Sequence, residues 1–82
     1  MTKRIVITSE QVRAARALLR WKQNDLADVS EVSLPTIKRL EGMPGIISAN
    51  HLTLLAIERV LTEAGIEFIP ENGGGVGVRL KK

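Results

Sequence analysis

The chain has 82 residues, no cysteine and a formal net charge of +3 at pH 7. This length allows one small domain with a single core, and the lack of cysteine excludes disulfides and thiolate-bound metals. The apolar stretches are too short to span a bilayer, and the first residues lack the apolar core and cleavage site of a secretory signal. We therefore expect one domain over residues 1–82, with no membrane segment and a cytoplasmic location.

Basic residues are concentrated at the two ends of the chain. Residues 1–22 contain a single acidic residue, Glu10, together with Lys3, Arg4, Arg13, Arg16, Arg20 and Lys22, and the C-terminal end adds Arg79, Lys81 and Lys82. This asymmetry suits a polyanionic partner such as nucleic acid, but clustered cations are also common on an ordinary solvated surface. The charge pattern alone leaves both interpretations open.

The N-terminal part predicts an extended segment followed by a helix. "RIVIT" at 4–8 is rich in β-branched residues, which favour extended backbone. Thr8 with Gln11 three residues later has the pattern of a capping box, so we expect a helix from about Ser9 to Arg20. Its expected buried face consists of Val12, Ala15, Leu18 and Leu19. Arg13, Arg16 and Arg20 lie together beside that face.

Two short helices are predicted next. "QNDLADV" at 23–29 suits a helix with Leu26 and Ala27 inward and Asp25 near its positive N-terminal end, and "SEVS" at 30–33 ends it. Ser33 can cap the following helix, in whose first turn Pro35 is tolerated because the first amides have no intrahelical partner. Ile37 and Leu40 can then face a core, which leaves Leu34, Pro35, Lys38 and Arg39 to face outward.

A longer helix and a hairpin complete the chain. Gly42, Pro44 and Gly45 form a break, after which a helix is expected from near Ser48 or Asn50 to Gly65, with a core stripe of Leu54, Ile57, Leu61 and Ala64. "IEFIP" and "VGVRLKK" alternate on either side of "ENGGG", which predicts a hairpin that pairs Ile66 and Phe68 with Val76, Val78 and Leu80. We expect a helical part over about 8–65 and a β-hairpin over about 66–82.

Two short helices joined by a tight turn form a helix-turn-helix unit, whose second helix enters the major groove of DNA; a generic helical bundle is the alternative. The stretch "QNDLADVSEVSLPTIKRLEG" at 23–42 resembles the Cro/CI-type, or Xre-like, family of bacterial and phage regulators. The resemblance rests on Gln23, Leu26-Ala27, Val32-Ser33, Ile37 and Leu40-Glu41, and it extends upstream through "RAARALLRW". It implies a mainly α, lambda-repressor-like bundle of about four helices, here followed by the small C-terminal β-hairpin.

The chain departs from the family pattern at two positions. Lys22 stands where the family has a Ser or Thr cap, which costs about 1 kcal/mol on capping scales but places a cation near the expected phosphates. Glu31 stands where the family favours Gly in the turn, so it is expected to adopt a left-handed conformation.

The resemblance implies which face meets DNA, and side-chain chemistry then assigns the contacts. The expected base contacts are Leu34, Pro35, Thr36 and Arg39, with the first two on thymine methyls and Arg39 on guanine. The expected phosphate contacts are Lys22, Gln23, Ser33 and Lys38. The family pairs an Arg of the first helix with the Glu after the recognition helix's Leu, which implies an ion pair between Arg16 and Glu41. For Arg13 and Arg20 the sequence does not decide between contact with a phosphate and simple solvation.

No arrangement of residues indicates an enzyme. The serines lack a His and acid that would activate a nucleophile, and the single histidine, His51, has no metal-binding partners, so we expect neither cofactor nor metal. The expected function is sequence-specific binding of a double-stranded DNA operator as a dimeric transcriptional regulator, a repressor of a phage-like or mobile-element operon. Two alternatives stay open: an antitoxin that binds a toxin protein and represses its own operon, and a protein-interaction module.

Dimerisation is expected through the hairpin, because the long helix already uses its apolar stripe for the core. The residues expected at this interface are Phe68, Val76, Val78 and Leu80, with "RIVI" at 4–7 as a further edge. The alternative is a hairpin that only covers its own chain.

Overall fold

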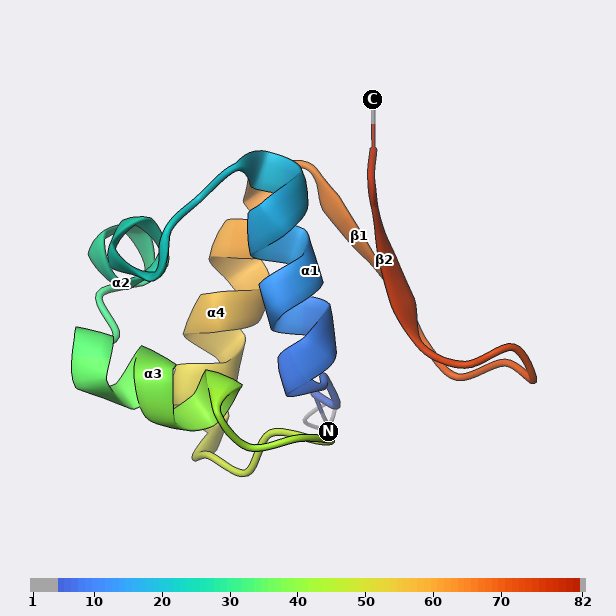
Figure 1. The fold of residues 1–82 in the computed structure, drawn as a ribbon, viewed down its shortest axis with the longest axis horizontal. Coiled ribbons are helices and arrows are strands. Elements are labelled where there is room, and N and C mark those ends of the chain that lie inside the picture. Colours follow the sequence, from blue (N-terminus) through green and yellow to red (C-terminus); the bar gives the residue numbers. More distant parts are fainter. Residues whose placement is uncertain (1–4, 82) are drawn as a thin grey trace.

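The computed structural model describes residues 5–81 and is mainly helical, as predicted (Figure 1). Over these residues the chain forms four helices and then a two-stranded antiparallel hairpin: α1 (Ser9–Leu19), α2 (Gln23–Ser30), α3 (Leu34–Glu41), α4 (His51–Glu63), β1 (Ile66–Ile69) and β2 (Gly77–Leu80). Packing joins α2 to both α3 and α4, α1 to α3 and β2, and α4 to β1. Lys3, Arg4 and Lys82 of the basic set lie outside the described residues.

The first helix begins at the predicted capping box. The Thr8 hydroxyl accepts a hydrogen bond from the Gln11 backbone N–H at 3.0 Å, and the Gln11 side-chain oxygen accepts one from the Thr8 N–H at 2.9 Å. The helix ends one residue before the predicted Arg20, which is left-handed with φ of 60°. The expectation that Leu18 is buried is wrong: it is 44 % exposed, because the core contacts the row of Val12, Ala15 and Leu19, and Leu18 lies beside that row.

The turn between α2 and α3 has the predicted form. At the start of α2 the Lys22 side chain provides no cap, but the Asp25 carboxylate accepts a hydrogen bond from the Lys22 backbone N–H at 2.8 Å. Glu31 ends this helix with a φ of 63°, in the left-handed region. Ser33 caps α3 by accepting from the Thr36 N–H at 3.3 Å, with Pro35 in the first turn.

The long helix α4 begins at Asn50, whose side chain accepts a hydrogen bond from the Thr53 N–H at 2.8 Å. Gly65 follows the helix with a φ of 111°, as the sequence predicted. The inward stripe of α4 is Leu54, Ile57 and Leu61, whereas Ala64, which was expected in this stripe, is only half-buried. The buried hydrophobic core of the described residues is Ile7, Val12, Ala15, Leu26, Ile37, Leu40, Ile47, Leu54, Ile57, Leu61 and Ile66.

The N-terminal segment is extended and adds to this core. The Ile7 carbonyl accepts a hydrogen bond from the Ile47 N–H at 2.9 Å, and Thr8 and Ile46 form an isolated antiparallel bridge. Both isoleucines at 7 and 47 are buried. The segment thus pairs with the loop between α3 and α4 and closes one side of the helical part.

The hairpin pairs Ile66 with Leu80 and Phe68 with Val78, and its turn extends away from the helices in Figure 1. The expectation that Val76 belongs to this ladder is wrong, because Val76 precedes β2 and is 45 % exposed. The Glu71 carboxylate accepts hydrogen bonds from the N–H groups of Gly73 and Gly75, and both glycines have a positive φ. This wide glycine turn leaves Val76 outside the strand.

Candidate nucleic-acid interface

Helix α3 has one face in the core and one face in solvent. Ile37 and Leu40 are each 1 % exposed, which fixes the rotation of the helix. Pro35, Lys38 and Arg39 are exposed on the other side, as predicted. The two remaining residues with expected base contacts, Leu34 and Thr36, are half-buried, so part of each side chain is taken up by the protein itself.

Three of the four residues with expected phosphate contacts lie at the N-terminal ends of α2 and α3, and the fourth, Lys38, is exposed in the last turn of α3. Lys22 and Ser33 are exposed and Gln23 is half-buried. The Ser33 hydroxyl is already within the cap, since it also donates a hydrogen bond to the Thr36 hydroxyl at 2.8 Å. The Gln23 amide donates to the Glu41 carboxylate at 3.0 Å, which leaves its second N–H for an outside acceptor.

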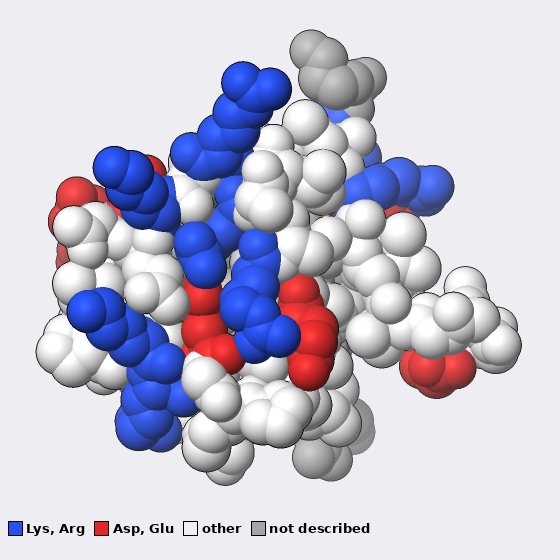
Figure 2. Space-filling model, viewed as in Figure 1, with Lys and Arg blue, Asp and Glu red and all other residues white. Residues whose placement is uncertain are grey.

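Cations gather on the face that carries these helices. Figure 2 has the same orientation as Figure 1 and shows Lys and Arg side chains over α1 and toward α2 and α3. The exposed Lys and Arg residues of α1, α2, α3 and the segments between these helices are Arg13, Arg20, Lys22, Lys38 and Arg39. Two acidic residues in this region are paired with arginines: a carboxylate oxygen of Glu10 lies 3.9 Å from a guanidinium nitrogen of Arg13, and one of Glu41 lies 2.6 Å from Arg16.

Glu41, the last residue of α3, is held by a bidentate ion pair. The Arg16 Nε donates to Glu41 Oε2 at 2.7 Å, and the Arg16 Nη2 donates to Oε1 at 2.6 Å. The two side chains are only 18 % and 3 % exposed, respectively. The structure therefore brings together the two residues that the family resemblance paired, away from bulk water, where such a pair fixes geometry strongly.

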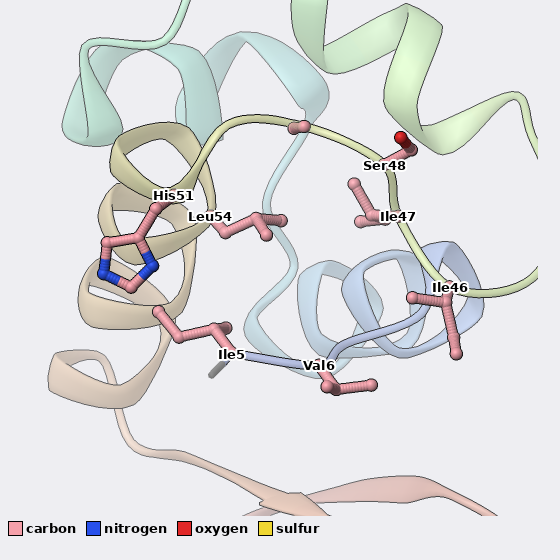
Figure 3. A pocket seen from close by; sticks show the side chains of 8 residues that line it. Ile5, Val6, Ile46, Ile47, Ser48, His51 and Leu54 are labelled. Atoms are coloured by element: carbon pink, nitrogen blue, oxygen red, sulfur yellow. The ribbon is translucent and has the colours of Figure 1, made fainter. Parts of the chain in front are cut away.

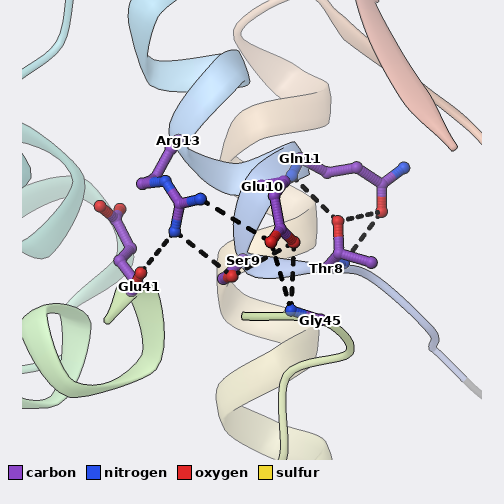
Figure 4. A network of polar contacts seen from close by, with 7 residues as sticks. All are labelled: Thr8, Ser9, Glu10, Gln11, Arg13, Glu41 and Gly45. Atoms are coloured by element: carbon purple, nitrogen blue, oxygen red, sulfur yellow. Dashed lines mark hydrogen bonds and ion pairs between the residues drawn. The ribbon is translucent and has the colours of Figure 1, made fainter. Parts of the chain in front are cut away.

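Other contacts extend this arrangement to all three N-terminal helices. The Arg16 guanidinium also donates to the Trp21 carbonyl at 3.0 Å, at the connection from α1 to α2. The Arg13 Nη1 donates to the Glu41 backbone carbonyl at 2.5 Å and to the Ser9 hydroxyl at 3.3 Å (Figure 4). Arg13 thus binds the carboxyl end of α3, where a cation is favourable. The sequence left Arg13 open between phosphate contact and simple solvation, and its contact with the end of α3 was not predicted, although its spacing of three from Arg16 places both on one side of α1.

Glu10 fastens the loop after α3 to the start of α1. Its carboxylate oxygens accept hydrogen bonds from the Gly45 N–H at 3.2 and 3.4 Å (Figure 4). The backbone N–H of Glu10 itself, the Gly45 N–H and the nearby Arg13 together lower the pKa of the Glu10 carboxyl. On the hairpin, the hydrogen bond from Arg79 lowers the pKa of Glu67.

The residues expected at a dimer interface fall into two groups. Phe68 and Val78 are half-buried and pack against the chain's own core. Leu80 and Val76 are 39 % and 45 % exposed. The hairpin therefore covers its own chain with one pair of side chains and leaves the other pair in solvent.

Two concave surfaces lie away from α3. A cavity of about 380 Å³ lies between the N-terminal segment and the loop before α4, with Ile5, Val6, Ile47 and Leu54 around it and His51 at one side (Figure 3). A groove of about 720 Å³ follows α4 between the N-terminal segment and β1. Within residues 5–81, no three His, Cys, Asp or Glu side chains are placed to hold a metal ion. None of the helices described is long and apolar enough to cross a membrane.

No protein-family model matches this sequence, and no curated protein is significantly similar to it.

Proposed function

We propose that the protein binds double-stranded DNA sequence-specifically, as a dimeric transcriptional regulator of the Cro/CI type, with α3 as its recognition helix. The observation that carries this proposal is the exposed face of α3, where Pro35, Lys38 and Arg39 stand in solvent on the cationic side of the molecule. A three-residue turn at 31–33 joins α2 to α3, which is the arrangement of a helix-turn-helix unit.

Side-chain chemistry divides the proposed contacts. Arg39 reads a guanine through its two parallel N–H donors, and Pro35 makes apolar contact with a thymine methyl. Lys38 and Lys22 neutralise phosphates, and the second N–H of Gln23 adds a neutral phosphate contact. Leu34 and Thr36 contribute their exposed parts only.

The contacts on Glu41 support this assignment because three side chains from two helices hold the end of α3. Arg16 and Arg13 reach it from α1, and Gln23 reaches it from α2. A recognition helix must enter the major groove at a fixed angle, so a rigid attachment to its neighbours lowers the cost of binding. In this proposal Arg13 and Arg16 position the helix, and they do not contact bases.

A dimer is part of the proposal since specific operators commonly consist of two half-sites about 34 Å apart. The exposed Val76 and Leu80 and the open hairpin edges supply the proposed contact between two chains. By the resemblance to the Cro/CI type, the proposed regulator is a repressor of a phage-like or mobile-element operon. The alternative, an antitoxin that also binds a toxin protein, is supported by the groove of about 720 Å³ along α4 and β1.

Selection from a random duplex library, followed by fluorescence anisotropy on the selected sequence, tests the proposal. We expect Lys38→Ala to weaken binding to all duplexes and to reduce the slope of log affinity against log salt by about 1. Arg59→Ala is the matched control, because Arg59 is an exposed cation on the side of α4 opposite its buried stripe. Equal losses in both variants, or no enriched sequence, would contradict the proposal.

A further inference from the structure

Gln11 is buried, and its side-chain amide uses all its hydrogen-bonding groups. The residue is 4 % exposed. Its oxygen accepts from the N–H of Thr8 at 2.9 Å and from the Thr8 hydroxyl at 3.3 Å. Its nitrogen donates to the carbonyls of Gly77 at 3.0 Å and of Ile69 at 3.3 Å. A primary amide has two donors and two acceptor sites, so its capacity is filled.

The two carbonyls belong to one rung of the hairpin. Ile69 and Gly77 are register partners at the end of the ladder next to the glycine turn. Gln11 is near the start of α1, and in Figure 4 its side chain extends away from Arg13, which contacts α3. A single side chain therefore links the cap of the first helix to both strands of a hairpin that lies 58 and 66 residues further along the chain.

The remaining contacts between the hairpin and the helices are largely apolar. Ile66 is buried, and Phe68 and Val78 pack against the core. Apolar burial is non-directional, so it holds the hairpin against the helices without fixing its angle closely. Among residues 5–81, no other side chain from the four helices is hydrogen-bonded to the strands. The directional part of the attachment is therefore supplied by Gln11.

We propose that Gln11 is a positioning residue that sets the orientation of the hairpin relative to α1. Because Arg13 and Arg16 attach α1 to the end of α3, the same link sets the orientation of the hairpin relative to α3. A second consequence concerns DNA and rests on the proposed function. In a dimer joined by hairpins, Gln11 sets the distance between the two recognition helices and hence the preferred spacing of half-sites.

Gln11→Glu separates the two tasks of this side chain. Glutamate is also a good partner in a capping box, so the variant keeps the acceptor for Thr8. It loses both donors and places a carboxylate oxygen against the carbonyls of Ile69 and Gly77. Thr8→Ala is the matched control, because it removes the cap hydroxyl and leaves the amide donors in place.

The distance between α2 and the hairpin turn is the first readout. The chain has no cysteine, so Asn24→Cys and Gly74→Cys provide two unique sites for spin labels. Both positions are exposed, and a side chain at 74 meets only ordinary contacts. Pulsed electron paramagnetic resonance should give one narrow distance distribution in the parent and in Thr8→Ala. In Gln11→Glu we expect the distances to spread over a broader distribution.

Two results would overturn the proposal: an unchanged distribution in Gln11→Glu, or equal broadening in Thr8→Ala. If Gln11→Glu does not fold, Gln11→Met replaces it, with similar length and no donors. Hydrogen exchange of the Gln11 amide protons in the unmodified protein provides an independent test. We expect slow exchange, and exchange as fast as that of a free amide would also refute the role.

The consequence for DNA has its own readout, namely affinity for operators with base pairs inserted between half-sites. We expect the parent to lose affinity when the spacing changes, and Gln11→Glu to lose this preference while it binds a single half-site normally. General destabilisation would weaken half-site binding instead. Identical spacing preferences would refute the consequence. If the parent binds no duplex, the proposed function fails, and the distance measurement still decides the role of Gln11.

Discussion

Loss of the Glu41 charge should destabilise the protein in the absence of DNA. Glu41 is 3 % exposed at its side chain and accepts hydrogen bonds from Arg16 and Gln23. Removing one partner of a buried ion pair commonly costs about 3–5 kcal/mol, because the other charge stays buried. An 82-residue domain has a total stability of only about 4–12 kcal/mol at typical values per residue. Glu41→Ala should therefore remove a large part of the total stability, and at the lower end of this range it unfolds the protein.

Glu41→Gln is the more informative variant. It keeps the shape of the side chain and one acceptor oxygen, and it removes the charge that faces Arg16. A hydrogen bond to a charged group contributes about 1.5–3 kcal/mol, so we expect a loss of about 2–3 kcal/mol. At about 4–8 °C per kcal/mol for a domain of this size, the melting temperature should fall by roughly 8–24 °C. Urea denaturation followed by the fluorescence of the single tryptophan, Trp21, measures the loss.

Glu67→Gln is the matched control, because it makes the same change in an exposed pair. The Glu67 and Arg79 side chains are 40 % and 65 % exposed, so the urea midpoint should hardly move. A double-mutant cycle with Arg16→Ala completes the test: once Glu41 is replaced, the second substitution should cost much less than it does alone. Fully additive losses, or equal effects of Glu41→Gln and Glu67→Gln, would refute the reasoning.

Three further predictions concern single positions. Glu31→Gly should stabilise the protein by about 1 kcal/mol in urea denaturation, because Glu31 holds a φ of 63° that glycine adopts without strain; a loss of stability would contradict this. Folding lowers the pKa of Glu10 from its ordinary value of 4.5, so the ionised carboxylate stabilises the fold at pH values above 4.5. This contribution is lost as the pH falls through the lowered pKa. Glu10→Gln should therefore flatten the fall of the urea midpoint in acid, and an unchanged acid profile would argue against it. Leu80→Glu should give a folded monomer in analytical ultracentrifugation if the exposed side of the hairpin joins two chains, whereas an intact dimer would place the interface elsewhere.

Local chemistry accounts for the features that the sequence predicted well. Thr8 with Gln11, and Ser33 with Pro35, are signals within one turn of helix, and both mark helix starts in the structure. Glu31 and Gly65 each follow the end of a helix, where a single residue in the left-handed conformation commonly stops the helix. Each of these features depends on neighbours in the chain, so a single sequence is sufficient to find it.

The errors and omissions involve contacts between distant parts of the chain. Leu18 satisfies a helical spacing, but only the tertiary packing decides which row of α1 meets the core. Val76 alternates correctly with Val78, yet the hydrogen bonds from the glycine turn to Glu71 exclude it from the strand. Gln11 has a sufficient local role in the cap, so nothing in its neighbourhood indicates that its amide also binds the hairpin.

The candidate interface was predictable only where it depends on spacing within one helix. Exposure of Lys38 and Arg39 follows from the spacing of the buried residues on α3, whereas the use of Gln23 and Arg13 as supports of Glu41 requires the three-dimensional arrangement of α1, α2 and α3.

The most direct test of the proposed function is the affinity of Arg39→Ala for the selected operator and for a set of duplexes with one base pair changed at a time. Arg39 is exposed on the outward face of α3 and is proposed to bind one guanine. We expect the substitution to cost about 1–3 kcal/mol on the operator and to remove the preference at one base position only. Unchanged affinity together with an unchanged preference at every position would contradict recognition of DNA through α3.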